Sequence, residues 1–164
     1  MLQYVERIKR TLGFIFSHPL GRKRPVKALQ RLIVWQVQTL VSPKRFIKKA
    51  FVASLKFYAR KGLTGITGNI YKGLHEFNDM AFVLHFLRRE DVFFDIGANV
   101  GAYTLLASGI CKAKSVAIEP IKSTFEILRM NVQLNHLDGP VSLINAGAAA
   151  ECGMLSFSAD EDTT

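Results

Sequence analysis

The sequence contains the stretch Val92-Phe93-Phe94-Asp95-Ile96-Gly97-Ala98-Asn99-Val100-Gly101, in which an apolar run leads into a glycine turn. The run at residues 92–95 is typical of a strand that is buried on both faces of a parallel sheet. Gly97 lets the backbone turn tightly, and Gly101 permits close packing where the next helix begins. We therefore expect a strand, a turn and a helix here, the unit that opens a Rossmann-like α/β sheet.

The same alternation continues beyond the turn. The pattern predicts a helix at residues 103–110 and a strand at residues 115–118. A second helix opens with a capping-box sequence at residues 123–126, and a third strand covers residues 141–145. This β-α-β-α-β order predicts a parallel sheet with right-handed crossovers.

Two acidic residues lie where a ligand would be expected. In an open parallel sheet, ligands bind outside the carboxyl ends of the strands. Asp95 ends the first strand and Glu119 follows the second, so both should face one crevice. Glu119 comes 18 residues after Gly101, which suits a carboxylate that holds the two hydroxyls of an adenosine ribose.

The acid at the turn separates two cofactor classes. A dinucleotide-binding fingerprint, G-x-G-x-x-G, directs backbone amides at a pyrophosphate, and here its first glycine position is Asp95. A carboxylate there would repel a pyrophosphate, whereas S-adenosylmethionine carries a sulfonium and an amino group and no phosphate. The charge therefore favours S-adenosylmethionine. The alternative is a glycine turn that merely joins strand to helix.

The first 61 residues have a different character. They hold 15 of the 22 Lys and Arg residues and a single acid, Glu6, whereas the remainder holds 7 bases and 12 acids. Helical spacing predicts helices at residues 1–18, 26–41 and 75–88, with a break at 19–25, a strand at 51–59 and a glycine-punctuated loop at 62–68. On the helix at 26–41, one face should contain the following residues: Leu29, Leu32, Ile33, Gln36, Val37 and Leu40.

This basic region has two interpretations. It packs as helices against the rest of the fold, with Trp35 in the core, or it docks on an anionic lipid surface, with Phe14, Phe16 and Trp35 inserting. Nucleic acid is not expected as a partner, because aromatic residues are not interleaved with the basic ones. Peripheral membrane contact through the basic N-terminus therefore stays open as the alternative.

Cysteine usage and hydropathy narrow the other possibilities. Cys111 and Cys152 lack metal-ligand spacing and form no disulfide framework, so we expect no metal site and a cytoplasmic protein, with membrane-peripheral placement as an alternative. Both are expected to be small buried hydrophobic side chains. No apolar run is long enough to span a membrane, and no signal peptide is recognisable.

Four segments together resemble the FkbM-type methyltransferase family. Residues 94–104 resemble its first motif, and Ile118-Glu119-Pro120 resembles its acidic second motif. Asn131 and Asn135 fit its N-x-x-x-N pattern, and residues 67–77 resemble the segment that precedes the domain in one branch. The resemblance covers roughly residues 60–164.

The resemblance implies an α/β fold with a Rossmann-like parallel sheet of the class I methyltransferase type, preceded here by basic helices. It also implies S-adenosylmethionine-dependent methylation of a hydroxyl on a sugar or other small-molecule acceptor. Asp95, Gly97, Asn99 and Gly101 would line the methionine end of the cofactor, with Glu119 on the ribose. Glu76 either reaches the same pocket or is a solvated helix acid. No catalytic base is identified, and His75, His85 and His136 are candidates by residue type only.

The chain holds less than the family's domain. Three central strands are recognisable where the resemblance implies seven, and a further strand begins at residues 153–157. We therefore expect an incomplete sheet, with an unpaired edge and an exposed apolar face. The predicted organisation is a basic, mainly helical extension at 1–61 and the N-terminal part of a methyltransferase domain at 62–164, a fragment. The alternative function is an inactive remnant that only binds cofactor, a membrane or another anionic surface.

Overall fold

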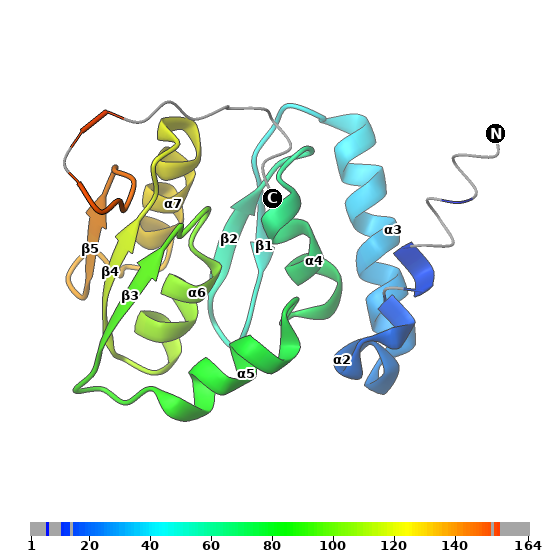
Figure 1. Cartoon of the computed structure of the whole chain (residues 1–164). Coiled ribbons are helices and arrows are strands. Elements are labelled where there is room, and N and C mark those ends of the chain that lie inside the picture. The colour runs from blue at the N-terminus through cyan, green and yellow to red at the C-terminus, as the bar shows by residue number, and fades with distance from the viewer. Residues whose placement is uncertain (1–5, 7–10, 14, 152, 155–164) are drawn as a thin grey trace.

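The computed structural model describes residue 6, residues 11–13, residues 15–151 and residues 153–154 of the chain. Its elements in chain order (Figure 1) are α2 (Pro19–Lys23), α3 (Pro25–Val41), β1 (Ile47–Ala50), β2 (Lys56–Ala59), α4 (Thr64–Lys72), α5 (Phe77–Phe86), β3 (Val92–Ile96), α6 (Ala102–Thr104), the π-helix η1 (Leu105–Ile110), β4 (Lys114–Ile118), α7 (Lys122–Leu134) and β5 (Val141–Ile144). The described residues leave out most of the strand predicted at 153–157 and of the first turns of the helix predicted at 1–18.

The parallel sheet has the predicted strands in the order β3-β4-β5. Asp95 pairs with Ala117, and Ala117 pairs with Leu143, so the three strands end at the same edge. The expected β-α-β-α-β succession of strands and helices is therefore confirmed. The second helix, α7, begins at Lys122 without a side-chain cap, so the predicted capping box at residues 123–126 is wrong.

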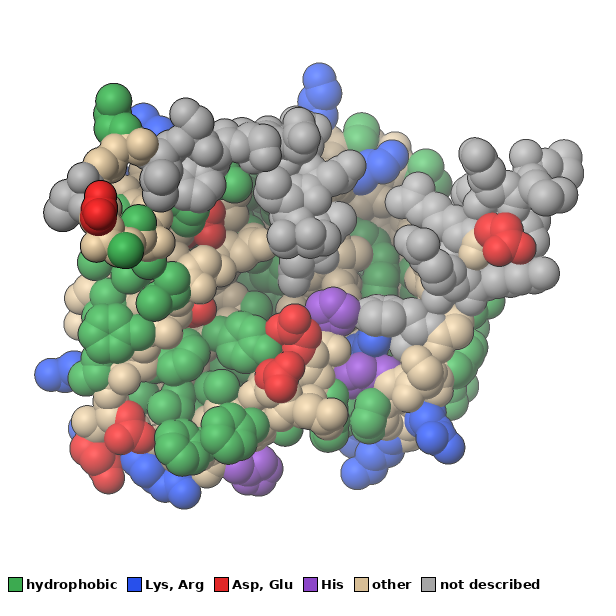
Figure 2. All heavy atoms as spheres, in the orientation of Figure 1, with side chains coloured by type: hydrophobic (Ala, Val, Ile, Leu, Met, Phe, Trp, Pro, Cys, Tyr) green, Lys and Arg blue, Asp and Glu red, His purple; other side chains and the backbone are tan. Residues whose placement is uncertain are grey.

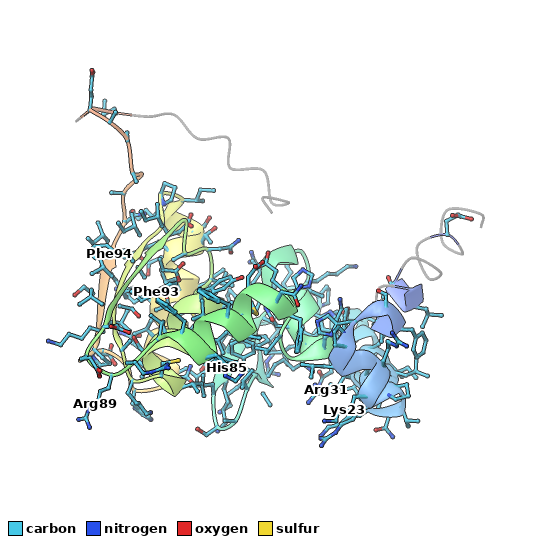
Figure 3. All side chains as sticks on the ribbon, turned by 60° about the horizontal axis from the view of Figure 1, so that its bottom comes forward. Lys23, Arg31, His85, Arg89, Phe93 and Phe94 are labelled. Carbon is cyan, nitrogen blue, oxygen red and sulfur yellow. The ribbon has the colours of Figure 1, made fainter. Side chains whose placement is uncertain are left out.

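One face of β3 is not covered by described residues. Successive side chains of a strand point to opposite faces. Val92, Phe94 and Ile96 are 53%, 61% and 62% exposed, whereas Asp95 is buried. Phe93 and Phe94 (Figure 3) therefore belong to different faces, and apolar side chains gather around β3 and α5 in Figure 2. The expected exposed apolar face is confirmed.

A second, antiparallel sheet of β1 and β2 docks on α7 through two asparagines. The backbone N–H of Lys56 donates to Asn135 Oδ1 over 2.9 Å, and Asn135 Nδ2 donates back to the Lys56 carbonyl over 2.7 Å. Asn131 accepts from the Tyr58 backbone N–H over 2.7 Å and donates to the Val100 carbonyl over 2.8 Å. The two amides thus occupy hydrogen-bonding groups of β2 that a neighbouring strand would otherwise occupy, which gives the N-x-x-x-N pattern a structural role.

Several local expectations in the first part of the chain are wrong. Residues 64–72 form α4 instead of a loop. Gly68 is needed there for packing, since a Cβ on it would lie 2.6 Å from the His75 ring. The break at 19–25 contains the short helix α2, and only residues 56–59 of the predicted strand at 51–59 are extended, because a turn precedes them.

Helix α3 buries a different face from the predicted one. Ala28, Trp35 and Thr39 are buried in the core, which confirms Trp35 as a core residue. Of the face expected from the sequence, Leu32 is partly buried against the core, whereas the other members are exposed: Leu29, Ile33, Gln36, Val37 and Leu40. The helix is apolar on both sides, so its periodicity could not choose between the two faces.

The remaining class expectations concern membranes, metals and cysteines. Among the described residues, no helix combines the length and apolar character needed to cross a membrane. The described part of the chain also contains no cluster of three or more metal-ligating side chains. Cys111 is a free thiol that is only partly buried, which differs from the expected buried side chain, and Cys152 lies outside the described residues.

The docking of β2 on α7 can be tested by replacing Asn131 with alanine. Asn131 is 0% exposed, so Asn131→Ala leaves the Tyr58 N–H and the Val100 carbonyl without this partner in a buried place. We expect the free energy of unfolding in urea to fall by about 2–3 kcal/mol. Gln133→Ala, at an exposed position of the same helix, should change it by less than about 0.5 kcal/mol. Coincident unfolding curves for the two variants would contradict this role.

Candidate cofactor site

The glycine turn after β3 is held in a left-handed conformation and tied to β4. The φ angles of Gly97, Asn99 and Gly101 are 76°, 49° and 92°. The backbone N–H groups of Gly97 and Ala98 both donate to the Ile118 carbonyl over 2.9 Å. Asn99 tolerates its positive φ better than most residues with a side chain. The turn therefore has a defined shape at the carboxyl ends of two adjacent strands.

The two glycines of the turn serve different purposes. A Cβ on Gly101 would lie 2.5 Å from Leu128 Cδ1, so Gly101 allows α7 to pack closely, as the sequence predicts. A Cβ on Gly97 would meet nothing within 4 Å. Gly97 therefore leaves open space beside the turn, where a ligand can approach the backbone.

Glu119 organises this turn from the end of β4. Its side chain is 5% exposed, and each carboxylate oxygen accepts a backbone N–H over 2.9 Å, Oε2 from Asn99 and Oε1 from Ile121. Asn145, just after β5, donates to the Glu119 carbonyl over 2.7 Å. Because a carboxylate oxygen can accept more than one hydrogen bond, Glu119 keeps acceptor capacity for a ligand hydroxyl.

Asp95 is the second buried acid of the site. It is 8% exposed, and its Oδ2 accepts from the Thr104 backbone N–H over 2.9 Å and from the Thr104 hydroxyl. Burial raises the pKa of Asp95, the negative charge of Glu119 raises it further, and the two hydrogen bonds from Thr104 act in the opposite direction. Thr104 is therefore a positioning residue that sequence reasoning missed, since nothing in its local pattern marks it.

No basic side chain compensates these two acids in the described part of the chain. The ion pair found there joins Arg129 to Glu126 on the exposed side of α7. A buried carboxylate without a cation is costly, and the cost falls when a positive group binds beside it. The two buried acids therefore favour a cationic ligand at this site.

Glu76 reaches the site region through Tyr103. The Tyr103 hydroxyl donates to Glu76 Oε2 over 2.7 Å, and Tyr103 lies in the first turn after Gly101. Burial and this hydrogen bond raise the pKa of Tyr103. The segment before α5 is thus joined to the helix that follows the glycine turn, while Glu76 itself is exposed. The other five predicted cofactor-binding residues lie at or just after the ends of β3 and β4.

The three histidines that are candidates for a catalytic base by residue type lie in different surroundings. His75 packs over Gly68 of α4, and burial lowers its pKa. His85 is exposed on α5 (Figure 3), and His136 is exposed with a φ of 55° just after α7. These positions do not single out a base.

Solved structures confirm the class of fold. The chain has the class I fold of S-adenosylmethionine-dependent methyltransferases. A Pyrococcus horikoshii protein provisionally described as a transferase matches with a TM-score of 0.51 at 17% identity, over 77% of this chain and 50% of that chain. A Methanocaldococcus jannaschii tRNA m1G37 methyltransferase matches at 0.46 and 19%, over 62% and 30%. An S-adenosylmethionine-dependent methyltransferase from Agrobacterium tumefaciens matches at 0.47 and 14%, over 61% and 32%. The chain thus spans half or less of each of these proteins.

A family model then places the chain more narrowly. The model described as the Vibrio cholerae RfbT protein matches residues 58–150, more than half of the chain. The chain belongs to this family. The FkbM-type family is not the one that matches, so that narrower resemblance stays a prediction. No curated protein matches the sequence.

The expectation that nucleic acid is not a partner is corrected by these structures. The matching structures include a tRNA methyltransferase from Methanocaldococcus jannaschii and a complex with tRNALeu. The lack of interleaved aromatic residues in the first 61 residues argues only against stacking on bases. It does not exclude a nucleic acid that is held through its phosphates.

The raised pKa of Asp95 gives a test of its burial. Between the ordinary value of 3.8 and the raised value, the folded chain holds a proton that the unfolded chain has released. Raising the pH through this window therefore lowers the free energy of unfolding. Asp95→Asn keeps an oxygen for Thr104 but cannot titrate, so the variant should gain stability relative to the wild type as the pH rises. Urea unfolding at a series of pH values measures this, and a pH-independent difference between the two chains would contradict it.

Proposed function

We propose that this chain binds S-adenosylmethionine and belongs to an enzyme that transfers its methyl group to an acceptor. The observation that carries the proposal is the pair of buried acids, Asp95 and Glu119, beside an open left-handed glycine turn with no described cation to compensate them. The sulfonium and amino groups of this cofactor supply positive charge. When bound, the cofactor supplies an electrophilic methyl group.

The residues present fit this cofactor better than a dinucleotide. Two buried carboxylates would repel a pyrophosphate, and the turn amides of Gly97 and Ala98 are already bonded to Ile118. The acceptor capacity left on Glu119 suits ribose hydroxyls. We propose that Asp95, Gly97, Asn99 and Gly101 line the methionine end.

The roles of Thr104 and Glu76 follow from their contacts. Thr104 holds the Asp95 carboxylate in place by two hydrogen bonds. Glu76 bonds to Tyr103 and is exposed, so we propose that it forms part of the rim of the pocket and not its floor. Holding the donor in a fixed place is the main contribution expected from these side chains, because displacement at a methyl group depends on alignment.

We further propose a hydroxyl as acceptor, on the strength of the FkbM-type resemblance of residues 94–104. A hydroxyl acceptor requires a base to take its proton. The division into a basic extension at 1–61 and a methyltransferase part at 62–164 is likewise a proposal. Because β2 bonds to Asn131 and Asn135, the two parts would pack together. A cytoplasmic location is proposed from cysteine usage.

Calorimetric titration of the chain with S-adenosylmethionine tests the cofactor proposal. We expect binding, with Asp95→Asn and Glu119→Gln each weakening it by about tenfold or more, because each removes a buried charge that faces the cofactor. Glu126→Gln is the matched control, since Glu126 is an exposed acid on α7 paired with Arg129. It should leave the affinity unchanged.

Two results separate the possibilities, and a folding control accompanies them. Equal affinity in all three variants would overturn the assignment of the site. Affinity for S-adenosylmethionine without methyl transfer by the longest available form of the protein would favour the inactive-remnant alternative. Circular dichroism of each variant confirms that a lost affinity reflects the site and not unfolding.

A further inference from the structure

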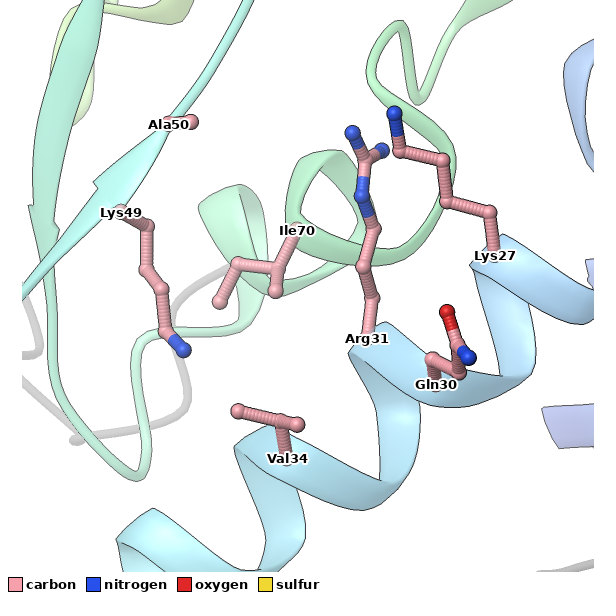
Figure 4. Close-up of a pocket in the computed structure, with 7 residues that line it drawn as sticks. All are labelled: Lys27, Gln30, Arg31, Val34, Lys49, Ala50 and Ile70. Carbon is pink, nitrogen blue, oxygen red and sulfur yellow. The ribbon is translucent and has the colours of Figure 1, made fainter.

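A concave region lies away from the glycine turn, between α3, α4 and the β1–β2 hairpin. It consists of two cavities of about 310 Å³ and 290 Å³, both of which are lined by Lys27 and Arg31. The first cavity continues along α2 and residues 71–74, and the second continues toward Lys49 and Ile70 (Figure 4). We call the two together the basic cleft.

The charge of the basic cleft is of one sign. Among the described residues, its lining contains six cationic side chains: Lys23, Arg24, Lys27, Arg31, Lys49 and Lys72. None of the described residues that line either cavity is Asp or Glu. Gathering like charges in a concave surface is unfavourable unless an anion offsets them, and such a surface concentrates anions from solution.

Lys27 and Arg31 form the centre of the cleft. They are one turn apart on α3, so their backbones are separated by about 6 Å along the helix axis. In Figure 4 both side chains extend from α3 in the same direction, and both line each of the two cavities. This arrangement presents an ammonium and a guanidinium to the same ligand, as a phosphate group requires.

The N-terminus of α3 adds to this field. Helix α3 has 17 residues, its first turn holds no acid, and its N-cap, Arg24, makes no side-chain capping bond. The first N–H groups of a helix and its dipole favour an anion. Arg24, Lys27 and Ala28 line the cleft, so this helix end lies at the cleft.

Two other cations of the cleft, Lys72 and Lys49, differ in their burial and contacts. Lys72 is only 5% exposed, and burial lowers its pKa to about 8. A bound anion would favour its charged form. Lys49 is already engaged, because its ammonium bonds to Gln38 and lies over the Trp35 ring, 5.3 Å from the centroid. The phosphate contacts are therefore assigned to Lys23, Arg24, Lys27 and Arg31.

We propose that the basic cleft binds a ligand with two or more linked phosphate groups, centred on Lys27 and Arg31. Two adjoining cavities that share these cations suit linked phosphates better than a single small anion. The aromatic residues of the lining, Phe51 and Tyr71, are 7% and 8% exposed, so they offer no free face for stacking on bases. Contact is with phosphates, whether in a free diphosphate or in a polynucleotide backbone. The proposal does not depend on the cofactor site.

Titration of the chain with inorganic pyrophosphate at physiological ionic strength tests this proposal. We expect saturable binding, weakened about tenfold or more by Lys27→Gln with Arg31→Gln. The matched control is Arg22→Gln with Lys48→Gln, which removes the same charge from exposed cations outside the lining and should leave the affinity within about twofold. Each variant is compared with the wild type by circular dichroism.

Two further probes distinguish the source of the phosphates. A single-stranded RNA oligonucleotide that binds and is displaced by pyrophosphate indicates a polynucleotide, whereas binding of pyrophosphate alone indicates a free diphosphate, and both support the proposal. Equal losses in the cleft and control pairs, or no pyrophosphate binding, would overturn it. So would binding to phosphatidylglycerol vesicles that depends on Lys27 and Arg31 and is unaffected by pyrophosphate, since that result identifies a membrane-docking surface.

Discussion

The described fold depends on the bonding of the glycine turn to the end of β4. The Ile118 carbonyl accepts two turn amides, and the Glu119 carboxylate accepts a third from Asn99. These bonds hold the shape of the turn, including Asn99, whose positive φ carries a conformational cost that the two glycines avoid. They also join two strand ends into one ligand-facing edge, so the same contacts that stabilise the turn build the candidate pocket.

The two buried acids of this site, Asp95 and Glu119, lower the stability of the ligand-free chain. Burial and the nearby charge of Glu119 raise the pKa of Asp95, and hydrogen bonds from Thr104 to Asp95 offset part of that cost. A cationic ligand would remove the remainder. Strain of this kind is expected where a site is prepared for a ligand and not for packing.

Sequence reasoning succeeded where the signal is local. The strands at residues 92–96, 114–118 and 141–144 and the turn between β3 and α6 follow from short apolar runs and glycine chemistry. It failed where neighbours decide the outcome. Residues 64–72 contain two glycines and still form a helix, and Thr104 became a partner of Asp95 only once α6 closed over the turn.

By itself the sequence determined the parallel βα units, the left-handed turn and the presence of acids at two strand ends. Backbone conformation and the alternation of strands and helices depend on residues that are adjacent in the chain, so these features can be predicted from the sequence. Only the tertiary structure decided which face of α3 is buried, that Asn131 replaces a strand partner, and that Lys27 and Arg31 share a cleft with residues of α4. Those outcomes depend on contacts between segments that are far apart in the sequence. The burial of a side chain and the charges around it are determined by the segments that pack against it.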